Sequence, residues 1–159
     1  MIVRVDSKER LEDCLDIIQR SFITVADGFG LTKDNCPSHT AFMPLEKLVE
    51  QYADGRAMFL YEKSDEKVGY FSIRINGNSA ELDNLAVLPS YRHFGIGREI
   101  IEFAKKYASE HLCAGKLTIG IIEENTVLRN WYKNLGFVHT GTKKYPHLPF
   151  TVGFMEISL

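Results

Sequence analysis

The pattern of apolar and polar residues predicts strands and helices that follow one another at short intervals. Seven runs have the length and apolar or alternating composition of strands: residues 3–5, 57–62, 68–75, 80–88, 116–122, 137–142 and 151–158. Four segments carry apolar residues at helical spacing: the stretch that Ser7 is expected to cap, and residues 44–52, 98–111 and 125–135. The long irregular segment 27–40 separates the first two helices.

The order of these elements is β-α-α-β-β-β-α-β-α-β-β. Strands joined by short turns, such as Asn76-Gly77-Asn78, form antiparallel pairs, whereas strand–helix–strand units form parallel pairs. The chain is therefore predicted to be a mixed α+β protein rather than a doubly wound α/β protein. With 159 residues and no linker or low-complexity tract, residues 1–159 are expected to form a single domain.

Composition narrows the class of protein. Hydrophobic residues make up 45% and charged residues 25%, and the net charge is −2, which disfavours a nucleic-acid binder. No apolar run reaches the ~18–20 residues of a membrane span, and the first residues lack a signal-peptide core. Cys14, Cys36 and Cys113 are too few and too scattered for a disulfide framework, and the His and Cys spacing predicts no metal site. We therefore expect a cytoplasmic protein without nucleic-acid, membrane or metal partners.

The first chemical motif lies between a predicted strand and a predicted helix. It has the form Arg-x-x-Gly-x-Gly and consists of Arg92, His93, Phe94, Gly95, Ile96, Gly97 and Arg98. Glycines allow a tight turn, and a helix N-terminus presents unpaired N–H groups, so the segment suits a pyrophosphate. A tight turn with solvated arginines is the alternative. The segment is neither a Walker A loop nor a Rossmann turn.

The second motif is a predicted helix that follows a buried-looking strand. It has the form Asn125-x-x-Leu-x-Asn130-x-Tyr132-x-x-x-Gly136-Phe137. Asn125, Leu128 and Tyr132 share one side of that helix at spacings of three and four residues. Alone, the motif is also compatible with a plain amphipathic helix that ends at a glycine cap.

The two motifs together resemble the GNAT superfamily of N-acetyltransferases over about residues 82–137. Leu128 departs from the family pattern, in which a small residue is more usual. The resemblance implies a central, mostly antiparallel twisted sheet with one splayed parallel strand pair, here 80–88 and 116–122, flanked by about four helices. It also implies acetyl-CoA as the acyl donor.

Further site residues follow from the resemblance. The pantetheine arm is expected on the backbone of Leu85, Ala86 and Val87, and the pyrophosphate on the N–H groups of residues 92–98. Asn125 and Asn130 are expected to contact the cofactor. The Tyr132 side chain is expected to point to the thioester sulfur.

The reaction would be direct attack of a neutral amine on the thioester carbonyl. Tyr132 is the candidate general acid for the leaving thiolate, with a packed core tyrosine as the alternative. Strand alternation places Glu81 and Asp83 on one face with Leu85 and Val87, so these carboxylates are the candidate bases. Their alternative is a solvated or ion-paired role.

The last part of the expected site is the pocket that binds the amine acceptor. The resemblance implies a pocket built from residues 22–40 and 145–150. The candidates for acceptor binding are Phe22, Asp27, Phe29, His39, Tyr145 and Phe150. Each of these residues is also compatible with ordinary packing or a solvated loop, and nothing selects between a small-molecule and a peptide amine.

The sequence leaves three alternative functions and one assembly to consider. The first is transfer of an acyl group longer than acetyl, because the phosphate turn does not contact the acyl chain and so does not select its length. A non-catalytic acyl-CoA-binding or sensing module of the same fold is the main alternative, and a dinucleotide oxidoreductase is disfavoured by the missing Rossmann turn. A homodimer is compatible with the sequence, and residues 151–158 are a candidate edge strand.

Overall fold

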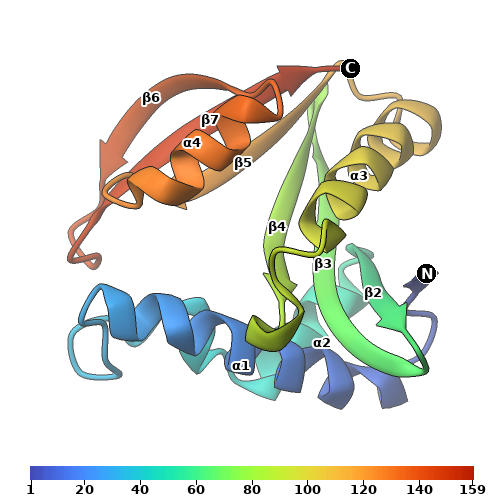
Figure 1. Cartoon of the computed structure of the whole chain (residues 1–159), viewed down its shortest axis with the longest axis horizontal. Coiled ribbons are helices and arrows are strands. Elements are labelled where there is room, and N and C mark those ends of the chain that lie inside the picture. Colours follow the sequence, from blue (N-terminus) through green and yellow to red (C-terminus); the bar gives the residue numbers. More distant parts are fainter. The chain divides into compact units, whose positions relative to one another are not determined.

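The elements of the computed structural model, which describes all residues Met1–Leu159, follow the predicted order (Figure 1). The strands are β1 (Ile2–Arg4), β2 (Ala57–Lys63), β3 (Glu66–Asn76), β4 (Ser79–Val87), β5 (Lys116–Ile122), β6 (Val138–Lys144) and β7 (Thr151–Ser158). The α-helices are α1 (Leu11–Gly28), α2 (Leu45–Ala53), α3 (Ile96–Leu112) and α4 (Thr126–Asn134). Short 3-10 turns are η1 (Lys8–Arg10), η2 (Thr40–Phe42) and η3 (Pro89–Tyr91).

The strands form one seven-stranded sheet in the order β1-β2-β3-β4-β5-β7-β6. Only β4 and β5 are a parallel pair, and their register runs over three residue pairs, from Ser79–Lys116 to Glu81–Thr118. β4 continues to Val87 beyond this register, and Asn84 within it has a left-handed φ of 54°. The mixed α+β prediction, with its parallel pair of strands 80–88 and 116–122, is therefore confirmed.

Three local predictions were wrong. Ser7 makes no side-chain cap, because the chain first forms η1, in which the Arg10 N–H bonds the Ser7 carbonyl oxygen, and α1 starts only at Leu11. The third helix begins at Ile96, inside the glycine motif, rather than at residue 98. β7 is not an edge strand, because it pairs with β5 on one side and with β6 on the other.

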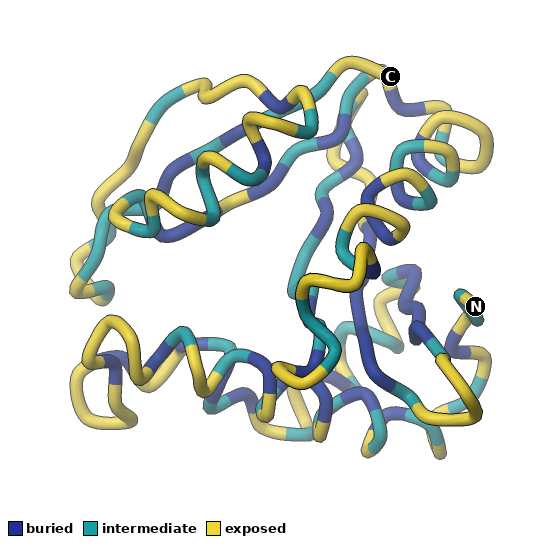
Figure 2. Tube along the Cα trace, viewed as in Figure 1, coloured by how far each residue is buried: buried dark blue, intermediate teal, exposed yellow.

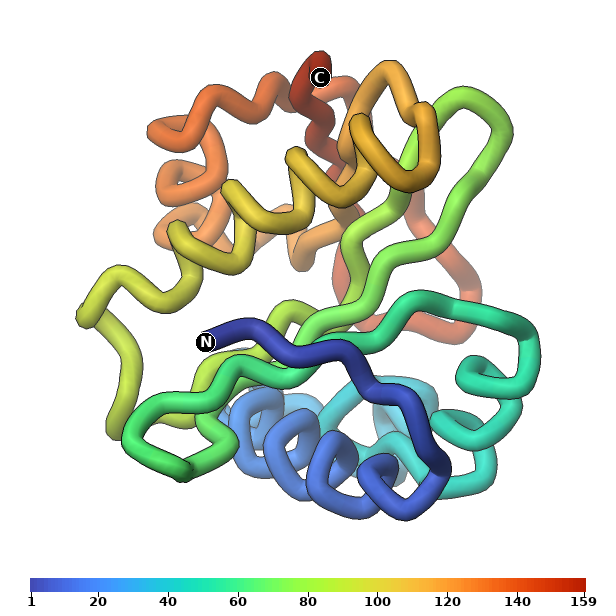
Figure 3. Tube along the Cα trace, turned by 90° about the vertical axis from the view of Figure 1, so that its right-hand side faces the viewer, coloured from blue at the N-terminus to red at the C-terminus, as the bar shows by residue number.

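The chain forms two compact units, which are described separately. The first unit comprises Met1–Ile73 and Asn84–Ile101. In it β1, β2 and β3 form antiparallel pairs, and β1 in dark blue can be followed beside β2 in Figure 3. The core of this unit is formed by fully buried side chains that include Leu11, Ile18, Leu48, Leu60, Tyr70 and Phe71.

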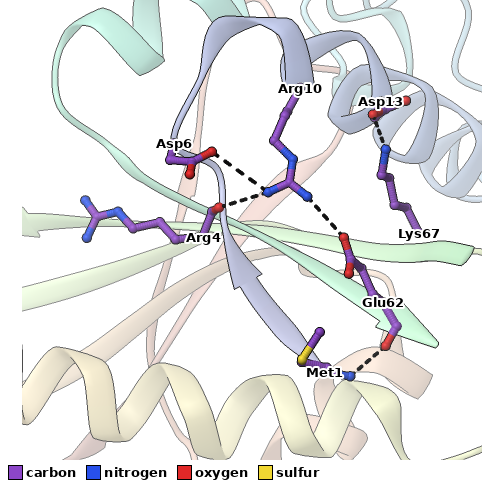
Figure 4. A network of polar contacts seen from close by, with 7 residues as sticks. All are labelled: Met1, Arg4, Asp6, Arg10, Asp13, Glu62 and Lys67. Atoms are coloured by element: carbon purple, nitrogen blue, oxygen red, sulfur yellow. Dashed lines mark hydrogen bonds and ion pairs between the residues drawn. The ribbon is translucent and has the colours of Figure 1, made fainter. Parts of the chain in front are cut away.

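Polar contacts join the N-terminal elements of the first unit to the β2–β3 hairpin (Figure 4). Arg10 donates to the Arg4 carbonyl oxygen and pairs with Glu62, while Lys67 pairs with Asp13 of α1. The Met1 amino group donates to the Glu62 carbonyl oxygen. These contacts lie at least partly in solvent, so we expect each to add less than about 1 kcal/mol to stability.

The second unit comprises Arg74–Asp83 and Glu102–Leu159. β7 lies between β5 and β6, and α4 runs along the direction of these strands (Figure 1). Leu117, Ile119, Phe137 and Met155 are buried, whereas β6 is exposed along almost its whole length (Figure 2). No helix of the structure has the length and apolar character needed to cross a membrane.

Candidate functional site

The glycine motif forms the connection from β4 to α3 in the first unit. Gly95 has a φ of 86°, a left-handed conformation that glycine adopts without strain, and His93 has a φ of 68°. At the start of α3 the Glu99 N–H donates a backbone hydrogen bond to the Gly95 oxygen of the motif, at 3.1 Å. The N–H groups that precede it are therefore the unpaired donors of a helix N-terminus, where an anion is stabilised.

The two arginines of this motif differ in their surroundings. Arg98 is exposed in the first turn of α3, so its charge is accessible to a bound phosphate. The Arg92 guanidinium instead donates three hydrogen bonds within the protein, to the Val87 oxygen, the Ser21 oxygen and the Thr24 hydroxyl. Its backbone N–H bonds the Pro89 oxygen. Arg92 is thus engaged on both its side chain and its backbone.

The end of β4 is held closely against β3 in the first unit. A Cβ at Gly69 would lie 3.2 Å from the Ala86 oxygen and 3.1 Å from the Tyr61 Cβ, so glycine permits this approach. The Leu88 N–H bonds the Val68 oxygen at 2.9 Å. The left-handed Asn84 directly precedes Leu85, so the strict alternation expected from Glu81 to Val87 is interrupted there.

In the second unit Tyr132 lies in an aromatic environment on α4. Its ring contacts Trp131 and Phe137 edge-on, with centroids 4.8 and 5.3 Å apart. Only 6% of the residue is exposed, and this burial raises the pKa of the Tyr132 hydroxyl above its ordinary value. The hydroxyl therefore stays protonated, which is the state that a general acid requires.

Asn125 caps α4 in the second unit. Its side-chain oxygen accepts the Leu128 N–H at 3.2 Å, so the amide NH₂ and one lone pair of that oxygen remain for a ligand. Asn130 is exposed on the same helix. Contacts of these two asparagines with a cofactor stay a prediction.

Glu81 and Asp83 share one cation in the second unit. The Arg74 side chain approaches Glu81 to 2.7 Å and Asp83 to 3.6 Å, which shows that both carboxylates lie on the same side of β4. Arg74 was missed from sequence. Gly77-Asn78 is a two-residue hairpin loop, so residue 74 lies opposite residue 81. The position of this turn in the sequence would therefore have been enough to predict that Arg74 lies next to Glu81.

The acceptor candidates fall into both units. Phe22 and His39 lie together in the first unit, with ring centroids 6.2 Å apart, and the Phe42 ring also contacts His39, at 6.1 Å. Asp27 and Phe29 are exposed at the end of α1. In the second unit Tyr145 and Phe150 are half-buried on the loop before β7.

His39 has a defined protonation state. Its Nδ1 accepts the Ala41 N–H, and burial lowers the pKa of the imidazole. His39 is therefore neutral at pH 7 and carries its hydrogen on Nε2, which makes it a hydrogen-bond donor rather than a cation.

One charged cluster of the second unit was not predicted from sequence. The Glu123 carboxylate bonds Arg129 at 2.6 Å and His139 at 2.8 Å, and both partners lower its pKa. These residues join the end of β5, helix α4 and strand β6. No group of three or more His, Cys, Asp or Glu side chains is placed to hold a metal ion.

Comparison with known proteins indicates an acetyltransferase family. The model of the acetyltransferase (GNAT) family matches residues 15–137. An uncharacterized N-acetyltransferase in the pepI 3′ region of Lactobacillus delbrueckii subsp. lactis is 29% identical over 150 residues, which cover 85% of this chain and 82% of that protein.

Two solved structures share the fold at low sequence identity. A ribosomal-protein-alanine N-acetyltransferase from Brucella melitensis has a TM-score of 0.73 and 22% identity, covering 100% of this chain and 99% of that one. PaiA N-acetyltransferase from Thermoplasma acidophilum, in complex with coenzyme A, has a TM-score of 0.75 and 19% identity, covering 100% and 99%. With its central mostly antiparallel sheet, its single parallel pair and a family match over residues 15–137, the chain belongs to the GNAT acetyltransferase family.

Proposed function

We propose that residues 1–159 act as one domain that transfers the acetyl group of acetyl-CoA to a primary amine. The observation that carries this proposal is the buried, protonated phenol of Tyr132 in a GNAT acetyltransferase chain, and we propose Tyr132 as the general acid. The turn at 92–98 supplies N–H donors and Arg98 for the pyrophosphate. The backbone of Leu85, Ala86 and Val87 supplies the polar groups for the pantetheine arm and for the carbonyl oxygen.

The proposed reaction is a direct transfer. The neutral amine attacks the thioester carbonyl, so that a C–N bond forms and the C–S bond breaks. The CoA thiolate takes the hydroxyl proton of Tyr132, and the new ammonium loses a proton to solvent or to a base. Tyr132 regains its proton from solvent, so atoms and charge balance over the cycle.

The ion pairs of Glu81 and Asp83 bear on the choice of acceptor. Arg74 occupies lone pairs of these carboxylates that a base would offer to the acceptor. At pH 7 a lysine-type amine costs about 4.6 kcal/mol to deprotonate, whereas an α-amine costs only about 1–1.4 kcal/mol. We therefore propose that the acceptor is an α-amine, such as a peptide N-terminus, which hardly needs a base. The similarity to a ribosomal-protein-alanine N-acetyltransferase is in keeping with this class.

The test is a release assay for free CoA thiol with acetyl-CoA and a panel of amines. The panel contains Ala-, Ser- and Met-initiated peptides, the same peptides with a blocked N-terminus and an internal lysine, and spermidine. Faster thiol release with free N-termini than with blocked ones supports the proposal. Turnover of spermidine or blocked peptides alone would contradict the α-amine class. Tight acetyl-CoA binding without turnover of any amine would favour the non-catalytic binding module instead.

A further inference from the structure

Arg92 joins the phosphate turn to helix α1 across 71 residues of sequence. Its Nε donates to the Val87 oxygen at 3.0 Å, one terminal nitrogen donates to the Thr24 hydroxyl at 3.0 Å, and the other donates to the Ser21 oxygen at 2.9 Å. These distances are typical of good N–H···O bonds. A single planar group therefore fixes the strand end, the turn and the helix relative to one another within the first unit.

The contacts on α1 are concentrated at one point. Thr24 also donates its hydroxyl to the Ser21 oxygen at 2.8 Å, so Arg92, Thr24 and the Ser21 carbonyl form a closed set of hydrogen bonds. The Ser21 hydroxyl is buried and bonds nothing. The polar link from the turn to this part of α1 therefore runs through Thr24 and the Ser21 carbonyl.

The charge of Arg92 is not balanced by these partners. All three acceptors are neutral oxygens, and no carboxylate is among them. Partial burial lowers the pKa of the guanidinium, which reflects the loss of hydration around its charge. An anion in the adjacent turn would lower the electrostatic energy of this cation without touching it, because a partly desolvated charge is weakly screened.

We infer that Arg92 is a positioning residue that couples occupancy of the phosphate turn to the order of α1 between Ser21 and Gly28. This inference rests on the proposed function, since it takes the pyrophosphate of CoA as the anion. That part of α1 carries Phe22 and Asp27, two candidates for acceptor binding. Binding of the cofactor therefore stiffens the helix that is proposed to meet the amine.

The experiment is hydrogen–deuterium exchange of the full chain with and without CoA, followed in peptides that cover residues 21–28. At about 100 times the dissociation constant, CoA is expected to slow exchange there by about threefold or more in the wild type. In Arg92→Met the slowing is expected to disappear, although CoA still binds through the backbone N–H groups. Arg98→Met is the matched control. It removes a charge of the same turn, so it weakens CoA affinity by about tenfold, yet at saturation it keeps the slowing in α1.

Two further variants guard against a folding defect in Arg92→Met. Thr24→Val removes one acceptor at nearly constant shape and should leave a partial effect, and Arg92→Lys keeps the charge but not the planar fork. Unchanged α1 exchange in CoA-saturated wild type, or full slowing in a folded Arg92→Met, would overturn the inference. So would loss of CoA binding in a folded Arg92→Met, since that result would make Arg92 a direct ligand. A wild type that binds no CoA would instead refute the proposed function on which the inference rests.

Discussion

The carboxylate of Glu123 lies directly over the backbone of Gly153. A Cβ at position 153 would overlap that carboxylate, and the Glu123 N–H bonds the Thr151 oxygen of the same strand. Gly153 is therefore the position at which β7 makes room for the charged cluster of Glu123, Arg129 and His139.

Gly153→Ala is expected to destabilise the protein by about 1–3 kcal/mol, because the added methyl group must displace Glu123 from two ion pairs. Urea unfolding followed by circular dichroism measures the change. Gly120→Ala is the control, since its Cβ would meet only Val152 at 3.7 Å, an ordinary contact. Equal stability losses in both variants would show that the Glu123 contact is not the cause.

The ion pairs of Glu123 predict a dependence of stability on pH. The pKa of Glu123 is lowered in the folded protein from its usual 4.5, so the unfolded chain binds the proton first as the pH falls. The stabilisation is therefore complete above pH 4.5 and is lost as the pH falls through the lower folded-state pKa. The stability difference between wild type and Glu123→Gln should shrink over this window in urea titrations. Glu110→Gln, an exposed substitution on α3, should show no such trend, and a constant Glu123→Gln difference would contradict the assignment.

Tyr132→Phe is expected to reduce turnover by about 10²-fold or more, the usual contribution of a positioned acid, and to leave CoA affinity little changed. Steady-state kinetics and calorimetric titration with CoA separate the two effects. Tyr52→Phe, which removes the hydroxyl of a half-buried tyrosine in the first unit, is the control. Wild-type turnover in Tyr132→Phe would remove this residue from the mechanism.

Gly95→Ala tests the phosphate turn. Its φ of 86° disfavours any side chain by about 1–2 kcal/mol, so the turn should shift and CoA affinity should fall by about tenfold. Gly55→Ala carries the same backbone strain at a φ of 82° in open space outside the turn. We expect both variants to lose stability and only Gly95→Ala to lose affinity. Normal CoA binding by Gly95→Ala would place the phosphate elsewhere.

Glu81→Gln and Asp83→Asn test whether either carboxylate accepts the amine proton. With an α-amine acceptor we expect both variants to keep the pH–rate profile of the wild type, because the amine itself sets the profile near pH 7.7–8.0. A profile shifted by one substitution and not by the other would identify that residue as the base. It would also contradict the proposal that the acceptor needs none.

Much of the fold was predictable because it depends on local patterns. The limits of β5 and β7 agree with the predicted 116–122 and 151–158, since both are apolar runs bounded by polar or turn residues. The apolar character of 151–158 nevertheless suggested an edge strand. The apolar residues instead reflect an inner position in the sheet, because a strand that is paired on both sides and covered by a helix is more buried than an edge strand.

The site was predictable where a motif is contiguous, and not where its partners are distant in sequence. The glycine spacing predicted a phosphate turn at 92–98, and the family resemblance, rather than the helical spacing, predicted the role of Tyr132; both roles stay predictions. Nothing in the motif shows that Arg92 bonds Ser21 rather than a phosphate, because that depends on how α1 packs. The same holds for His139, whose partner Glu123 is brought near by the pairing of β5, β7 and β6.

Strands β1 and β6 are the two edge strands of the sheet, and the residues of β6 oppose the addition of another strand. Lys143 and Lys144 are exposed there, and the ladder to β7 shifts between His139 and Gly141. A strand adds to an edge only where that edge is regular and no like charges are forced together. Two copies laid side by side along β6 would bring lysines together across an irregular ladder. This edge of the sheet is thereby protected against pairing from chain to chain into an aggregate.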